Sequence, residues 1–208
     1  MKTLRTTGNV FIFLGLSILF FVLYELVGTS AITKGHQSEL QAEFDTALAH
    51  PAGLNPAFTG DLPVPGTGGG GVKGIARLKI PKIGVNVIVV EGVTLERLAY
   101  GPGHYPQTKL FGEKGATGVA GHRTGWSAPF FNLDKLARGD EVIVETTAAT
   151  YTYRVTDTIV VSPAHSEVLD GNPKSHAEQQ LVLTTCTPKF TAKNRLVVFT
   201  DLIQTVAR

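Results

Sequence analysis

The chain is poor in cysteine and in charge. It has one cysteine among 208 residues, and charged residues make up 17% of its composition. A single thiol cannot form an internal disulfide, and it excludes zinc sites built from paired cysteines. Nineteen Lys and Arg against seventeen Asp and Glu give a formal net charge of +2, which is no basic excess with which to neutralise nucleic-acid phosphates. We therefore expect no nucleic-acid partner.

The apolar residues that are present include one long run near the N-terminus. Val10–Val27 is apolar apart from Ser17, Tyr24 and Glu25. As a helix this run would span about 27 Å, close to the ~30 Å hydrocarbon core of a bilayer. The sequence therefore predicts a single membrane-crossing helix.

The charges around this run predict its orientation. Lys2 and Arg5 precede it, so the positive-inside bias predicts a cytoplasmic N-terminus and an extracytoplasmic remainder. We interpret residues 1–30 as a cytoplasmic N-terminus and transmembrane signal anchor. A cleaved secretory signal peptide is the alternative, since small residues follow the run.

Residues 31–74 are expected to connect this anchor to a folded domain. Leu40, Phe44 and Leu48 fall at helical spacing, which indicates a polar helix within 31–50. Half of the 24 residues from Pro51 to Gly74 are Gly or Pro, a composition typical of a linker.

Residues 75–208 carry the pattern of an all-β domain. Short runs rich in Val, Ile, Thr and Tyr alternate with Gly and Pro turns. The predicted strands are Ala76–Pro81, Val85–Glu91, Thr117–His122, Glu141–Thr146, Thr150–Val161, Gln180–Cys186 and Arg195–Asp201. Brief helices are expected at Thr94–Tyr100 and Phe131–Leu136. Such spacing favours one closed barrel or sandwich with its own core.

Three residues with reactive side chains lie at ends of predicted strands. Cys186 follows an apolar run, and Pro188 closes that strand because proline cannot donate to a central ladder. Arg195 opens the next strand, so an antiparallel pair would bring thiol and guanidinium to one rim of the sheet. His122 ends another predicted strand.

Together these side chains suffice for acyl transfer through a thioester. A cysteine thiolate is a nucleophile, and an imidazole can protonate a departing amine. A guanidinium keeps its proton and suits a carbonyl oxygen that gains charge. Cys186, His122 and Arg195 are therefore candidates for catalytic residues.

Composition and spacing leave other interpretations of these residues open. A lone cysteine at the end of an apolar strand is more often a small core residue. His122 equally fits a loop hydrogen bond, and Arg195 fits an ordinary ion pair. Arg123, next to His122, competes with Arg195 for the oxyanion role.

The segment LVLTTCTPKFTAKNRLVVF around Cys186 resembles the active-site segment of sortases, the anchored cysteine transpeptidases of the Gram-positive cell envelope. Their motif is T-L-x-T-C with an arginine some nine residues further on. GPGHYPQT at 101–108 and VAGHRTGWSAPFFNLDKLARGD at 119–140 also resemble sortase segments, in the right order, and are most similar to class E. The resemblance covers residues 75–208. Val182 departs from the first Thr of the motif, and Thr187 stands where many class E members have His.

The resemblance implies a closed eight-stranded sortase-type β-barrel with short helices, preceded by the transmembrane helix. It implies Cys186 as nucleophile, His122 as general acid and Arg195 as the group that steadies the substrate carbonyl. Thr185 is implied to line the substrate pocket, and Tyr105 is our candidate for a selectivity contact. No cofactor and no metal site is expected.

The implied reaction cleaves an LPxTG-like or LAxTG-like sorting signal between Thr and Gly. The acyl group then passes to an amine of a peptidoglycan precursor. The implied partners are sorting-signal peptides, that precursor and the membrane. An L,D-transpeptidase is a competing enzyme class, although its S-H-G-x-x-x-C signature is absent, and a non-catalytic anchored β domain of the envelope is the other alternative.

Overall fold

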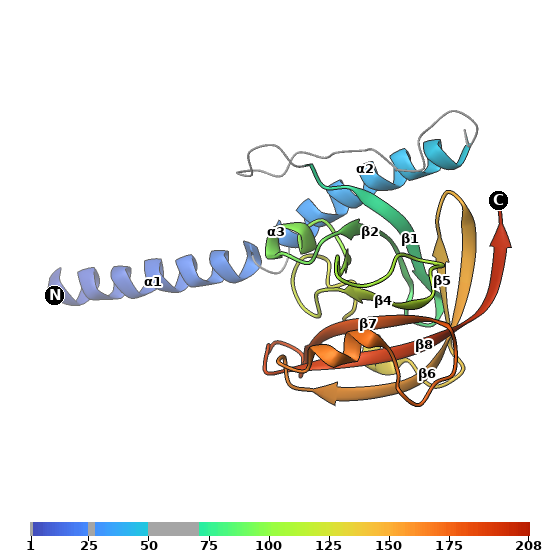
Figure 1. Cartoon of the computed structure of the whole chain (residues 1–208). Coiled ribbons are helices and arrows are strands. Elements are labelled where there is room, and N and C mark those ends of the chain that lie inside the picture. Colours follow the sequence, from blue (N-terminus) through green and yellow to red (C-terminus); the bar gives the residue numbers. More distant parts are fainter. Residues whose placement is uncertain (1, 25–27, 50–70) are drawn as a thin grey trace.

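Residues 2–24, 28–49 and 71–208 are described by a computed structural model (Figure 1). Its helices are α1 (Lys2–Leu23), α2 (Thr29–Ala49) and α3 (Leu95–Leu98), with 3-10 turns η2 (Pro81–Ile83), η3 (Leu133–Lys135) and η4 (Ser166–Asp170). Its strands are β1 (Gly74–Ile80), β2 (Val85–Glu91), β3 (Gly103–His104), β4 (Gly115–Ala120), β5 (Glu141–Glu145), β6 (Ala149–Val161), β7 (Gln179–Thr187) and β8 (Asn194–Ala207). The predicted Gly/Pro linker, from Pro51 on, lies outside the described residues as far as residue 70.

The strands close into a barrel, which confirms the predicted all-β class and the eight-stranded fold. Their order is β1-β2-β3-β4-β7-β8-β6-β5, and β5 closes the circle by pairing antiparallel with β1. The pairs β2–β3 and β4–β7 are parallel. All seven predicted strands are present, and the two-residue β3 is the strand that the sequence pattern missed.

One apolar cluster fills the barrel. It consists of alternate residues of the strands, because successive side chains of a strand point to opposite faces. Leu78, Val119, Tyr153, Leu183 and Val198 are among its members, and each is at most 1% exposed. Burying this cluster is the main favourable contribution to folding of the barrel.

The predicted polar helix is confirmed as α2, and it packs against the outside of β1 and β2. Leu40 and Phe44 are fully buried there in a cluster with Val72 and Ile88. Figure 1 shows α2 lying alongside β1 and β2. The helix is therefore part of the same folded unit as the barrel.

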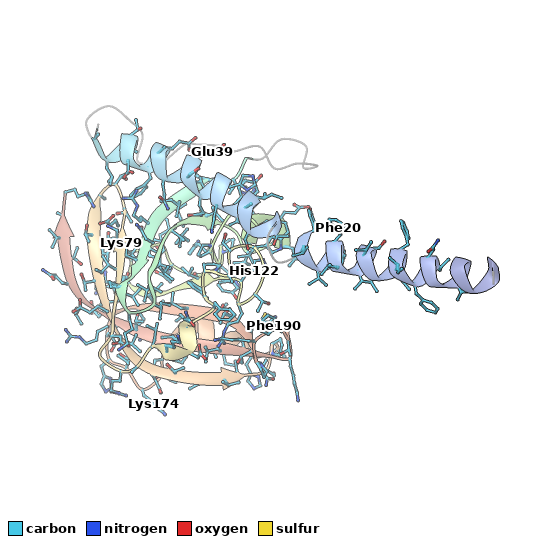
Figure 2. All side chains as sticks on the ribbon, turned by 180° about the vertical axis from the view of Figure 1, so that it is seen from behind. Phe20, Glu39, Lys79, His122, Lys174 and Phe190 are labelled. Atoms are coloured by element: carbon cyan, nitrogen blue, oxygen red, sulfur yellow. The ribbon has the colours of Figure 1, made fainter. Side chains whose placement is uncertain are left out.

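Helix α1 projects away from the barrel (Figures 1 and 2). Its large apolar side chains are exposed, among them Phe11 at 67% and Phe13 at 75%. Within the described residues, no helix is both long and apolar enough to cross a membrane. The predicted span, Val10–Val27, continues into residues 25–27, which lie outside those residues.

Candidate active site

Cys186 and Arg195 face each other across two neighbouring strands. They are directly paired in the antiparallel ladder of β7 and β8. Leu181 and Leu183 of β7 point into the barrel core, so the alternation of side chains places Cys186 on the outer face. Leu196 points into the core as well, which places Arg195 on that same outer face. The sulfur is therefore outside the barrel and partly exposed.

His122 reaches this site from the adjacent strand. β4 runs parallel to β7 with Ala120 opposite Thr184, and the N–H of Gly121 donates to the carbonyl of Thr184 at 3.0 Å. β4 ends two residues earlier than the predicted strand, so His122 follows it in the loop at the edge where Cys186 and Arg195 pair. The pairing of Cys186 with Arg195 is present in the fold, and the meeting of all three side chains stays a prediction.

The imidazole of His122 belongs to a half-buried residue. Its Nε2 is buried and has no hydrogen-bond partner among the described residues. Burial lowers the pKa of His122 below its ordinary value. The neutral imidazole therefore dominates at neutral pH, and the proton-donating form is a minority species.

Arg195 is held by its backbone surroundings. Its Nη1 donates to the carbonyl oxygens of Ala192 and Asn194, both at 3.2 Å. No carboxylate of the described chain forms an ion pair with it, and the side chain is half-buried. On the other side of β8, Val161 of β6 pairs with Arg195 and places an apolar residue next to it. Within the described chain, no carboxylate therefore competes for this guanidinium with a group that enters the site.

Arg123 occupies a different position. It is 4% exposed, and its Nε donates to the carbonyl of Phe131 at 3.0 Å. Nη1 donates to the carbonyl of Cys186 at 3.3 Å, and Nη2 lies 3.0 Å from a carboxylate oxygen of Asp134. These contacts tie the loop after His122 to the end of β7. They favour Arg195 over Arg123 as the arginine that faces a substrate.

Thr185 and Tyr105, the other predicted substrate contacts, lie on opposite sides of the β4–β7 pair. Thr185 is 3% exposed, and its hydroxyl donates to the carbonyl of Gly121 at 2.7 Å, so it fastens β7 to the end of β4. The hydroxyl of Tyr105 lies 3.0 Å from that of Thr184, two residues before Cys186. The sequence reasoning missed Thr184, although the two-residue period of a strand puts it on the same face as Cys186.

A cleft of about 510 Å³ extends over the outer face of β4. One wall is the segment after Tyr105, with Thr108 and Lys109, and the other is η4, with Glu167 and Asp170. Its floor includes Ala116. Across the described ranges, no cluster of three or more His, Cys, Asp and Glu side chains is arranged to hold a metal.

Comparison with known proteins agrees with this geometry. The model of the sortase domain matches residues 78–203. Sortase SrtE1 of Streptomyces coelicolor is 32% identical over 96% of this chain and 57% of its own length. Sortase SrtE2 of the same organism is 32% identical over 98% of this chain and 83% of its own length. The chain therefore spans little more than half of the SrtE1 length.

Solved structures show the same barrel. The crystal structure of sortase E1 from Streptomyces coelicolor, with a tripeptide in the active site, has a TM-score of 0.62 and 35% identity, covering 65% of this chain and 91% of that one. Sortase E from Streptomyces avermitilis has a TM-score of 0.59 and 37% identity, with the same two coverages. The chain belongs to the sortase family of cysteine transpeptidases and is of the class E type.

Proposed function

We propose that this protein is a membrane-anchored extracytoplasmic transpeptidase that cleaves an LPxTG-like or LAxTG-like sorting signal between Thr and Gly. It then transfers the acyl group to an amine of a cell-wall precursor. The observation that carries the proposal is the pairing of Cys186 with Arg195 on the outer face, next to the end of the strand that leads to His122.

In the first half-reaction, the Cys186 thiolate attacks the carbonyl carbon of the signal's Thr. The guanidinium of Arg195 stabilises the oxygen, which gains negative charge. As the C–N bond to Gly breaks, its electron pair stays on nitrogen, which takes a proton from the His122 imidazolium. A thioester and a neutral imidazole remain.

In the second half-reaction, an amine of the acceptor attacks the thioester carbon. The amine gives a proton to the neutral His122, a new amide bond forms, and the C–S bond breaks to regenerate the thiolate. Because burial lowers the pKa of His122, most of the imidazole is neutral and available to accept this proton, although the same shift makes it a weaker base. The same shift slows the first half-reaction, because only the minority of enzyme molecules with a protonated His122 can donate the proton.

The outer face of β4 and β7 offers a path for an extended peptide. At about 3.3 Å per residue, the rise from Gly115 to His122 corresponds to roughly 23 Å, enough for a five-residue signal. The cleft beside Ala116 would receive the residues before the scissile bond, and Tyr105 with Thr184 would contact the middle of the signal. Arg123 would act on the substrate indirectly, by fixing the carbonyl of Cys186.

Membrane anchoring is supported by the uncharged run that begins at Thr6 and by its exposed aromatic side chains. Alkaline extraction of membranes that contain the full chain tests this part. The protein should stay with the lipid, and the intact mass should include residues 1–30. Loss of that segment would instead identify a cleaved signal peptide.

The catalytic proposal is tested with fluorogenic LPxTG and LAxTG peptides and the full-length protein. Mass spectrometry of the wild type should detect a covalent thioacyl adduct on Cys186, formed with release of the Gly-containing fragment. Cys186→Ala should fold with an unchanged melting temperature and show neither adduct nor cleavage. Cleavage by Cys186→Ala would refute Cys186 as the nucleophile, and neither adduct nor cleavage by the wild type with any peptide would favour a binding domain instead.

A further inference from the structure

The loop that follows His122 has an unusual backbone. Gly125, Trp126, Ser127 and Ala128 have φ values of 68°, 48°, 60° and 41°. Residues with a Cβ rarely adopt this left-handed region. Three of them in succession persist only where surrounding contacts hold them in place.

The first turn of α2 supplies such contacts. The N–H of Trp126 donates to the hydroxyl of Thr29, and the N–H of Ser127 donates to the hydroxyl of Ser30, both at 3.3 Å. The hydroxyl of Ser127 donates in return to the carbonyl of Ser30 at 3.0 Å. These partners are 97 residues apart in the chain. Thus α2 holds two consecutive amides of the left-handed segment.

The other end of the loop returns directly to His122. The N–H of Phe130 donates to the carbonyl of His122 at 3.1 Å. The ring of Phe130 is fully buried against Gly121, where an added Cβ would lie 2.5 Å from a ring carbon. The backbone on both sides of the imidazole is therefore fixed by the same loop that α2 holds.

Helix α2 is itself fixed on the barrel at independent points. The hydroxyl of Thr33 donates to the carbonyl of Ala99 at 2.8 Å. The amide of Gln37 donates to the carbonyls of Tyr100 and Ile88 at 2.7 and 2.9 Å, and its oxygen accepts from the N–H of Ile88. The first turn of α2 thus has a rigid support from which to hold the loop.

We propose that Thr29 and Ser30 are positioning residues for the reaction. Through Trp126 and Ser127 they clamp the loop that carries His122, and so they fix the imidazole relative to Cys186. The kinetic part of this inference rests on the proposed transpeptidase function. The clamp itself does not depend on that function.

Three variants of the full-length protein test the clamp. Thr29→Val combined with Ser30→Ala removes both hydroxyl acceptors. The exchange Thr29→Ser with Ser30→Thr keeps both hydroxyls and should restore wild-type behaviour. Ser38→Ala is the matched control on the same helix, because that exposed hydroxyl donates only to the carbonyl of Gly35 in its own helix.

Amide hydrogen exchange and NMR report on the clamp without any substrate. In the double variant that lacks both hydroxyls, the amides from Trp126 to Phe130 should exchange at least tenfold faster, and the ring signals of His122 should shift. The exchange variant and Ser38→Ala should match the wild type. Unchanged exchange in the double variant would overturn the proposal.

Peptide cleavage adds the catalytic readout. In the double variant, kcat should fall about tenfold while KM stays within twofold, because the imidazole and not the peptide-binding face is displaced. Faster exchange together with unchanged kcat would overturn the link to His122. If the wild type cleaves no sorting peptide, the proposed function fails, and the exchange and NMR results alone decide the clamp. If the double variant does not fold, Ser127→Ala replaces it, and we then expect about threefold faster amide exchange and about threefold lower kcat.

Discussion

Replacing Arg195 by alanine should lower kcat/KM for a sorting peptide by roughly 100-fold to 1,000-fold. The guanidinium is held by two backbone carbonyls, and no described carboxylate forms an ion pair with it. Removal of one preorganised donor to a developing oxyanion costs about 2.7–4 kcal/mol of transition-state stabilisation. At about 1.36 kcal/mol for each tenfold change in rate, this corresponds to two to three orders of magnitude.

Arg195→Lys separates the contribution of charge from that of geometry. A lysine keeps the positive charge, but it lacks the planar fork that Nη1 fixes against the carbonyls of Ala192 and Asn194. We expect this variant to recover about tenfold of the activity lost in Arg195→Ala. Full recovery would mean that charge alone matters.

Steady-state cleavage of the fluorogenic peptide measures these changes, with Arg154→Ala as the matched control. Arg154 is an exposed arginine of β6 whose guanidinium lies 3.7 Å from Glu141, so its loss should leave kcat/KM within twofold. Thermal melts check that each variant is folded. Folded Arg195→Ala with kcat/KM within threefold of the wild type would refute the assignment of Arg195 to the oxyanion.

Three further predictions concern the support of the site. Phe44→Ala should lower the free energy of unfolding by about 3–5 kcal/mol, because the side chain of Phe44 is fully buried between α2 and the barrel. Chemical denaturation measures this change. A decrease in the free energy of unfolding as small as that of Phe44→Leu would contradict the prediction. Gly121→Ala should lower kcat and lower the free energy of unfolding by roughly 1–3 kcal/mol, since the new methyl group would lie 2.5 Å from the Phe130 ring. An unchanged melting temperature would show that the ring moves aside without cost. Burial lowers the pKa of His122, so the unfolded chain takes up a proton first as pH falls below about 6.5. Stability should therefore be unaffected by this group above that pH and decrease below it. Chemical denaturation at several pH values should show that the free energy of unfolding decreases less steeply with falling pH in His122→Asn than in the wild type. Parallel plots of the free energy of unfolding against pH would show that His122 is not the cause of the decrease.

The strands were predictable because their residues obey local rules. Val85–Glu91 was predicted with the bounds that β2 has in the structure. β3 was missed because Gly103–His104 is too short to show a period. The length of β8 was also underestimated, since its end beyond Asp201 is exposed and is held by pairing with β6.

The site was predictable in part, for a related reason. Cys186 and Arg195 are separated by a short connection, so an antiparallel hairpin is the natural expectation, and the structure has it. The contacts of Thr29 and Ser30 with the His122 loop gave no signal, because the partners lie on elements with no shared pattern. Arg123 was ambiguous for the opposite reason: its neighbour His122 marks the site, whereas its own side chain turns toward Asp134 and the backbone.

The placement of His122 depends on strand direction rather than on any local pattern. In a parallel pair both strands end at the same edge of the sheet, and in an antiparallel pair one strand ends where its neighbour begins. Because β4 is parallel to β7 and β8 is antiparallel to it, the end of β4, the end of β7 and the start of β8 meet at one edge. Had β4 run the other way, its six residues would carry His122 about 20 Å from the thiol. The parallel β4–β7 pair is thus what brings the strand that leads to His122 to the edge where Cys186 and Arg195 pair.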